Sequence, residues 1–375
     1  MKYIDGFRAS APARALVSRI RDRAGELRGR TVHAMEVCGS HTMAIARYGI
    51  RDVLPPEVDL VSGPGCPVCV TPPGYIDAAV ELARRGVIVA TFGDMLNVPG
   101  SDTTLAAARA AGAAVEVCYS PSGAVTLAAQ HPAREVVFLA VGFETTIGPV
   151  VSTIDRAARE GVGNISLLTA FKLVPPALAA LGADPELQID AFLCPAHVSA
   201  IIGPEAYAPF AGPGGVPCVI AGFEPLDILL GLDDILRQLV AGEASVVNQY
   251  SRVVRPGGNA KAQALMARYL EPADADWRGI GVIPASGLAL RPEFETYDAA
   301  KKLSIAVAHG HVNPACLCGD VIKGKRKPPE CPMFAGACTP DTALGPCMVS
   351  SEGTCAAYYK YSRLGSRPLS GQPLP

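Results

Sequence analysis

Cysteine is the residue type in this sequence with the most capacity for chemistry, because twelve of the 375 residues are cysteines. A chain of this length does not need disulfide bonds for stability, and a reducing compartment keeps most thiols free. Many free thiols in one chain point to metal binding or redox chemistry. Their distribution is uneven: three are early (Cys38, Cys66, Cys69), three are scattered (Cys118, Cys194, Cys218) and six are late (Cys316, Cys318, Cys331, Cys338, Cys347, Cys355).

Cys38 lies where an apolar run gives way to a helical pattern. Ser40 or Thr42 can cap the helix that begins there. The dipole of a helix favours a thiolate beside its N-terminus, and a charge or proton on His41 would favour it further. Cys38 is therefore a candidate nucleophile or iron ligand. The alternative is a buried, inert cysteine.

Cys66 and Cys69 form a C-x-x-C pair, a spacing at which two thiols can form a disulfide or chelate a metal. The preceding segment, residues 63–65, reads Gly-Pro-Gly and favours an exposed, reactive loop. A four-ligand zinc site made by this pair with Cys38 and His41 is the alternative.

The six late cysteines are the second candidate centre. Four thiolates are the usual ligand set of a [4Fe–4S] cluster, so six candidates leave a choice. Their spacings do not match the pairs of zinc fingers, and we therefore favour a cluster over zinc.

Several other side chains are weaker candidates. Asp94 and Glu144 each follow an apolar run and are expected to act as acid–base or hydrogen-bonding groups, with helix capping or surface roles as alternatives. The C-x-x-H pattern of Cys194–His197 either lines a cleft or caps a helix. Cys118 and Cys218 lie within apolar runs and are expected to be core residues.

The elements that must position these residues are short apolar runs that alternate with Ala- and Leu-rich helical segments. Such βαβα alternation, with continuous apolar runs, is typical of parallel sheets covered by helices on both faces. Polar residues that follow the strands should converge in clefts at the carboxyl ends of the strands. The expected strands are Val32–Val37, Val58–Val61, Val87–Thr91, Ala114–Cys118, Val136–Val141, Ile165–Ala170, Ala191–Cys194 and Pro217–Ala221.

The predicted fold class is α/β, with two similar domains of parallel strands and flanking helices plus a smaller Cys-rich iron–sulfur domain. Residues 30–120 are assigned to the first α/β domain and residues 121–240 to the second. Residues 1–29, which read as a helix, are assigned with residues 241–375 to the cluster-binding domain. That last domain has few long apolar runs, so a bound metal centre is expected to support its fold.

Composition excludes several classes of function. The formal charge is −2, so no strong basic field exists to bind nucleic acid or a membrane surface. The first residues lack the apolar core of a signal peptide, and no stretch approaches the roughly 20 apolar residues of a membrane span. We therefore expect a cytoplasmic protein. One basic run, residues 323–327, is expected to be a solvated loop face, with contact to an acidic partner as the alternative.

Several motifs together resemble one known family. CGSHT at 38–42, GPGCPVCV at 63–70, TFGDMLNVPG at 91–100 and VGFETT at 141–146 occur in order, followed by CGDVIKGKRKPPECPMFAGACTP and GPCMVSSEGTCAAYY. In this combination they resemble the HypD family of hydrogenase maturation factors, from about residue 3 to residue 362. The combination is specific, although no single piece would be.

The resemblance implies a scaffold that assembles the Fe(CN)2CO unit of [NiFe] hydrogenases as transient cargo. It implies a complex with the small chaperone HypC and cyanide delivery by the HypE–HypF pair. It also implies the hydrogenase large subunit as an indirect partner. Cys38 would ligate the iron together with a cysteine of HypC, and His41 and Thr42 belong to the same motif. Cys66 and Cys69 would be a redox dithiol.

The resemblance also implies a ligand set for the [4Fe–4S] cluster. The family pattern C-x12-C-x6-C-x16-C maps onto Cys318, Cys331, Cys338 and Cys355, which leaves two late cysteines spare. The implied protein is an assembly scaffold with redox activity more than a conventional turnover enzyme. The alternatives are a stand-alone iron–sulfur thiol–disulfide oxidoreductase and a zinc-binding scaffold without a redox role.

Overall fold

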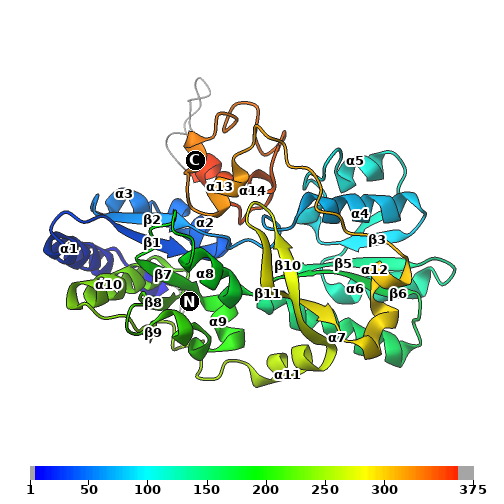
Figure 1. Cartoon of the computed structure of the whole chain (residues 1–375), viewed down its shortest axis with the longest axis horizontal. Coiled ribbons are helices and arrows are strands. Elements are labelled where there is room, and N and C mark those ends of the chain that lie inside the picture. The colour runs from blue at the N-terminus through cyan, green and yellow to red at the C-terminus, as the bar shows by residue number, and fades with distance from the viewer. Residues whose placement is uncertain (1–4, 362–375) are drawn as a thin grey trace.

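The structure, a computed structural model, describes residues 5–361. Two parallel β-sheets lie side by side with helices on their faces, and the late, cysteine-rich part of the chain covers the junction between them (Figure 1). The α/β class with parallel sheets and a cysteine-rich region is therefore confirmed. Among the described residues, no helix has the length and apolar character needed to cross a membrane.

Sheet A contains five parallel strands. In spatial order they are β2 (Val58–Ser62), β1 (Val32–Glu36), β7 (Ala191–Pro195), β8 (Cys218–Ala221) and β9 (Val246–Asn248).

Sheet B contains four parallel strands. In spatial order they are β4 (Val115–Val117), β3 (Ile88–Thr91), β5 (Val136–Gly142) and β6 (Ile165–Phe171). All eight expected strands are therefore present in the two sheets.

The two sheets do not divide the strands at the expected domain boundary between residues 120 and 121. The chain leaves sheet A after β2, builds all of sheet B, and then returns to sheet A at β7. The return is fixed by the pairing of β1 with β7, in which Ala34 is opposite Ala191. Each sheet thus takes strands from both expected ranges, and the two units are not consecutive in sequence.

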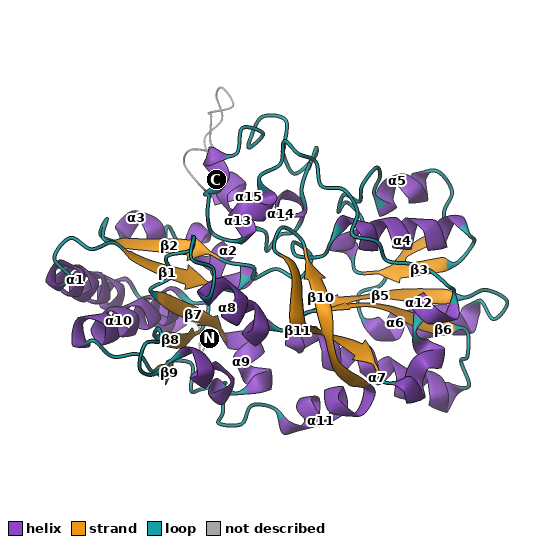
Figure 2. Cartoon of the chain, viewed as in Figure 1, coloured by secondary structure: helices purple, strands orange, loops and turns teal. Residues whose placement is uncertain are grey.

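Helices cover both faces of the sheets (Figure 2). The first half of the chain contains η1 (Asp5–Arg8), α1 (Ser10–Glu26), α2 (Gly39–Arg47), α3 (Ile50–Val53), α4 (Pro73–Arg84), η2 (Gly93–Met95), α5 (Leu105–Ala110), α6 (Pro121–Gln130), α7 (Glu144–Glu160) and α8 (Val174–Gly182). The second half contains α9 (Ala196–Ile202), η3 (Pro204–Phe210), α10 (Pro225–Ala241), α11 (Ala260–Tyr269), η4 (Pro292–Tyr297), α12 (Ala299–Lys302), α13 (Cys318–Ile322), η5 (Pro328–Glu330), α14 (Pro346–Val349) and α15 (Thr354–Tyr361).

Helix α1 does not join the cysteine-rich region as expected. Its apolar face, formed by Leu16, Ile20 and Ala24, is buried in the same core cluster as Ile228 and Leu232 of α10, under sheet A. Each large apolar side chain buried in this way contributes about 1.5–3 kcal/mol. The apolar face of α1 therefore packs against α10 beside sheet A, and α1 belongs to the helices that cover this sheet.

An antiparallel hairpin that the sequence did not reveal follows α11. It consists of β10 (Leu270–Trp277) and β11 (Gly281–Leu290). Trp277 is fully buried at its end, where the indole N–H donates to Ser286 Oγ at 2.8 Å and the ring stacks on Phe143. The turn of the hairpin reaches the cysteine-rich segment and so links sheet B to it (Figure 1).

Candidate functional site

The turns that follow β1 and β2 bring the early cysteines together. The Gly39 N–H donates to the Gly65 carbonyl at 2.9 Å, which fixes the Cys38 turn against the C-x-x-C turn. A Cβ on Gly65 would lie 2.3 Å from the Cys38 backbone nitrogen, so only glycine permits this approach. The parallel pairing of the two strands thus places Cys38, Cys66 and Cys69 at one edge of sheet A.

Cys38 occupies the N-cap position of α2, so Ser40 and Thr42 lie within the helix and do not cap it as expected. Burial and the negative charge of Glu352 raise the pKa of the Cys38 thiol to about 12. Backbone N–H groups of His41 and Ser40 act in the opposite direction, as expected at a helix N-terminus, but burial outweighs them. The free thiol is therefore protonated, and a bound metal would have to displace the proton.

A buried carboxyl group that the sequence analysis overlooked lies behind Cys38. Thr42 Oγ1 donates to Glu36 Oε1 at 2.6 Å, and the Cys38 N–H points at Glu36 Oε2 at 3.4 Å. Burial raises the pKa of Glu36 to about 7, and the hydrogen bond from Thr42 opposes that rise. The available signal was a glutamate inside an otherwise apolar strand, a position where charged residues are rare. The hydrogen bonds of Glu36 with Thr42 and with the Cys38 N–H thus fix the Cys38 turn on its buried side.

His41 is turned away from the early thiols. Its Nε2 donates to the carbonyls of Ala221 and Gly222, at 3.1 and 3.0 Å, and its ring packs on Phe223. Burial lowers the pKa of His41 to about 4, so the imidazole is neutral. His41 therefore anchors α2 to the end of β8. In residues 5–361, no three His, Cys, Asp or Glu side chains are grouped in a way that could hold a single metal ion, and His41 bonds to β8 and not to the early thiols.

The C-x-x-C pair is buried, contrary to the exposed loop that we expected. Cys66 and Cys69 are free thiols whose sulfurs lie 2.6 Å apart, and they are 4% and 3% exposed. Cys66 Sγ donates to Ser350 Oγ at 3.4 Å. Burial, then hydrogen bonding with Cys347 and Cys66, raises the pKa of Cys69 well above its usual value. A third sulfur, that of Cys347, therefore adjoins the pair.

The late segment also covers the Cys38 turn. Ser40 Oγ donates to Glu352 Oε1 at 2.8 Å. The charge of Glu352 also acts on Asp94, whose pKa is raised mainly by burial, and on His197. Ser40 and Glu352 thus join the start of α2 to the late segment beside Cys38. Glu352 was not predicted, because it lies in a segment without regular structure.

Glu144 has a structural partner within the framework. Its Oε1 accepts the Val174 N–H at 2.9 Å, which ties the start of α7 to the start of α8. Burial raises the pKa of Glu144 to about 7. The predicted hydrogen-bonding role is therefore observed, and it joins the helices of the two sheets.

All six late cysteines line one small apolar cavity. The pKa of Cys355 is raised, first by burial and then by the neighbouring sulfurs of Cys347, Cys316, Cys338 and Cys331. The thiols thus surround a shared space, and none of the charged side chains of the described chain lines it.

The residues around this cavity fit a [4Fe–4S] cluster. Each ligand of such a cluster binds a different iron, so the thiolates must surround a space and not converge on a point. A Cβ on Gly345 would lie 2.8 Å from Cys316 Sγ and would intrude beside the sulfurs. The Leu344 N–H points at Cys338 Sγ at 3.4 Å, a contact of the kind that tunes thiolate ligands.

Cys347, which the resemblance left as spare, lies between the two centres. It lines the late cavity, and it also lines a smaller cavity with Cys66, Cys69 and Glu352. Cys316 likewise faces the late cavity. The structure therefore gives neither spare cysteine a separate location, and Cys347 connects the dithiol to the six-cysteine cavity.

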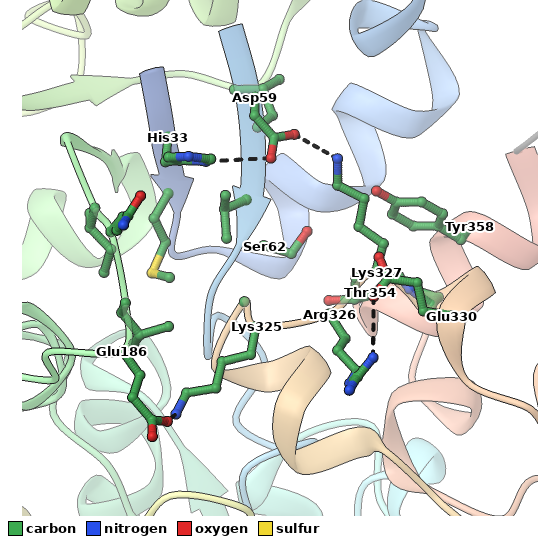
Figure 3. Close-up of a pocket in the computed structure, with 18 residues that line it drawn as sticks. His33, Asp59, Ser62, Glu186, Lys325, Arg326, Lys327, Glu330, Thr354 and Tyr358 are labelled. Carbon is green, nitrogen blue, oxygen red and sulfur yellow. Dashed lines mark hydrogen bonds and ion pairs between the residues drawn. The ribbon is translucent and has the colours of Figure 1, made fainter. Parts of the chain in front are cut away.

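The basic run is paired with acidic side chains, and Arg326 and Lys327 stay about half exposed, as expected of a solvated loop face. Figure 3 shows Lys325 beside Glu186 and Lys327 beside Asp59, with 2.7 Å between Lys327 Nζ and Asp59 Oδ1. Arg326 lies 3.8 Å from Glu330. The Lys327 pair joins this segment to the β2 edge of sheet A, and the Lys325 pair joins it to the loop before β7.

The fold and the site define a two-sheet α/β protein in which a buried thiol centre adjoins a six-cysteine cavity. Residues 11–362 match the family model HypD, described as the hydrogenase formation hypA family. The hydrogenase maturation factor HypD of Azotobacter vinelandii is 50% identical, with 97% of each chain covered. HypD of Escherichia coli K12 is 43% identical, with 96% of this chain and 98% of that protein covered. The chain belongs to the HypD family, and its function is hydrogenase maturation.

Proposed function

We propose that this protein is the scaffold on which the Fe(CN)2CO unit of a [NiFe] hydrogenase is assembled in the cytoplasm. A HypC-type chaperone would share the iron, a HypE/HypF-type pair would donate cyanide, and the hydrogenase large subunit would receive the product indirectly. The observation that carries the proposal is the adjacency of three thiol groups: Cys38, the Cys66–Cys69 pair, and the six-cysteine cavity reached through Cys347.

Cys38 is suited to hold the cargo iron. Cyanide and carbon monoxide stabilise low-spin iron, which is held well by soft thiolate donors in a closed site. The thiol is buried and protonated when free, so iron binding would release its proton. Thr42 and Glu36, which are joined by a hydrogen bond, fix the turn that presents it.

The dithiol is suited to redox work. Cys66 and Cys69 would form a disulfide on loss of two electrons and two protons, and would regain both on reduction. Cys318, Cys331, Cys338 and Cys355 would hold the cluster, which when bound supplies single electrons at this end of the molecule. The sulfur of Cys347 adjoins Cys69, within the same cavity wall.

The test is anaerobic purification from cells that also express the partner proteins, with iron and sulfide quantified and the cyanide and carbonyl infrared bands recorded. We expect Cys66→Ala to keep the cluster iron and sulfide but to lose the complete set of bands. Cys118→Ala, at a buried cysteine on the far sheet, should keep both. A full set of bands in Cys66→Ala would rule out the dithiol role.

A stand-alone thiol–disulfide oxidoreductase is the second candidate. It requires that a protein disulfide reach the dithiol, whereas Cys66 and Cys69 are almost completely buried. Turnover of a protein disulfide by the purified chain, without iron beyond the cluster, would favour this reading over the scaffold.

A further inference from the structure

Arg278 is a buried cation without a carboxylate partner. It lies at the turn of the β10–β11 hairpin and is only 2% exposed. Its Nη1 donates to the Pro99 carbonyl at 3.2 Å, its Nε has no hydrogen-bond partner, and none of the ion pairs within residues 5–361 includes it. Arginine is seldom buried so completely unless it is paired, because an uncompensated buried charge is costly.

The backbone around Arg278 lies between the two redox centres of the proposed function. The Arg278 N–H donates to the Val70 carbonyl at 2.8 Å, directly after Cys69. On the other side, a Cβ on Gly279 would lie 2.4 Å from Gly319 Cα, directly after Cys318. Arg278 is therefore held between the dithiol turn and the helix that carries the first cluster ligand.

The six-cysteine cavity would be costly for an anion on its own. Its lining is apolar apart from the thiols, and four thiolates around an oxidised cubane leave a net charge of about −2. A buried charge is stabilised by an opposite charge that is buried nearby. The anionic centre and the unpaired guanidinium would thus compensate each other.

The surroundings of the Arg278 side chain agree with this placement. Arg278 lines a neighbouring cavity with Leu344, whose N–H points at Cys338 Sγ. The guanidinium is therefore close enough to act on this group of sulfurs.

We propose that Arg278 is the buried counter-charge of the cluster site, a positioning residue that raises the reduction potential of the bound cluster. The proposal rests on the proposed function, since it requires the cluster. Reduction adds one negative charge, so a fixed cation nearby stabilises the reduced form more than the oxidised form. Arg278 would thereby keep the cluster reducible in an apolar setting.

The test is the midpoint potential of the anaerobically purified protein, titrated with dithionite and followed by electron paramagnetic resonance. Arg278→Gln should change the one-electron reduction equilibrium about tenfold toward the oxidised form, which corresponds to about 59 mV more negative. Arg278→Lys keeps the charge and should stay close to the wild-type potential. Arg268→Gln, which neutralises an exposed arginine on α11, should cause no shift.

A second readout separates the charge from packing. In cluster-free protein the guanidinium has no counter-charge, so Arg278→Met should be at least as thermally stable as wild type, whereas the cluster-loaded variant should be less stable. If Arg278→Gln does not fold, this comparison of Arg278→Met with wild type still tests the proposal.

Three results would overturn the inference. The first is an intact cluster with an unchanged potential in Arg278→Gln, and the second is an equal shift in Arg278→Lys. The third is an equal loss of stability with and without the cluster. The first two leave the proposed function standing, whereas a wild-type protein that binds no cluster would remove the basis of both.

Discussion

The early and late cysteines occupy two regions that are built in different ways. Cys38, Cys66 and Cys69 follow strands of sheet A, and backbone hydrogen bonds between their turns fix them in place. The late cysteines lie on turns and on helices of only four to eight residues, around an apolar cavity. The first region is supported by a sheet, and the second is supported by little besides its own loops.

This difference indicates which part of the protein depends on its cofactor. Strand pairing and a buried core already hold the early thiols in position without any ligand. A loop-rich region with a small core gains much of its stability from a bound metal centre. We therefore expect the early thiol turns to be preformed and the late cavity to be completed by the cluster.

The largest expected effect is on local stability when the cluster is removed by chelation. Amide protection in residues 316–355 should fall by about 100-fold or more, while protection in β5 stays unchanged, because only the late region relies on the cofactor. Hydrogen exchange with mass spectrometry measures both in one experiment. Equal loss of protection in both regions would remove the distinction between them.

Two glycines allow the comparison to be made by mutation. Gly65→Ala places a Cβ against backbone atoms of Cys38 and should cost about 3 kcal/mol or more in unfolding free energy. Gly345→Ala meets the side chain of Cys316, so its effect on unfolding should be small while iron and sulfide content drops. Gly336→Ala, where a Cβ has room, is the control. A large loss of unfolding free energy in Gly345→Ala would show that the late cavity is rigid without the cluster, which contradicts the comparison.

The junction of α7 and α8 should respond to pH through Glu144, whose folded pKa is raised from 4.5 to about 7. Below pH 4.5 the carboxyl is protonated in both states. As the pH rises from 4.5 to 7 the unfolded chain loses the proton first, so stability falls by about 3 kcal/mol and then levels off. Glu144→Gln should lack this slope in denaturation measured across the window, whereas Glu116→Gln, at an exposed site, should retain it. A slope that persists in Glu144→Gln would assign it to other groups.

The smallest expected effect concerns the hydrogen bond behind Cys38. Thr42→Val removes the hydroxyl that donates to Glu36 Oε1 and should lower the unfolding free energy by about 1–3 kcal/mol. Thr42→Ser keeps the hydroxyl and should restore most of the loss in the same urea titration. If Val and Ser behave alike, the contact is packing and not a hydrogen bond.

The sequence predicted the strands well and their pairing poorly. Most of the eight expected strands are largely apolar, β-branched runs, a local signal that the backbone follows. The β10–β11 hairpin was missed because Pro272 and Pro284 interrupt its strand patterns. The exchange of strands between the expected domains depends on the contact of β1 with β7, which no local pattern encodes.

The site residues also divide into those that a local pattern predicted and those that depend on tertiary packing. The rule that loops after parallel strands converge predicted that the turns of Cys38 and Cys66 would lie near each other, as they do. Cys347 and Glu352 could not be placed, because they reach the site through turns whose path depends on tertiary packing. The sequence also could not show that burial outweighs the helix N-terminus and raises the pKa of the free Cys38 thiol.

The most direct test of the scaffold is the infrared spectrum of the protein co-purified with its partners, for wild type, Cys38→Ser and Cys118→Ser. We predict cyanide and carbonyl bands in wild type and Cys118→Ser, and their loss in Cys38→Ser with cluster iron and sulfide retained. Bands of unchanged intensity in Cys38→Ser would contradict the assignment of Cys38 as the iron ligand and with it the central claim.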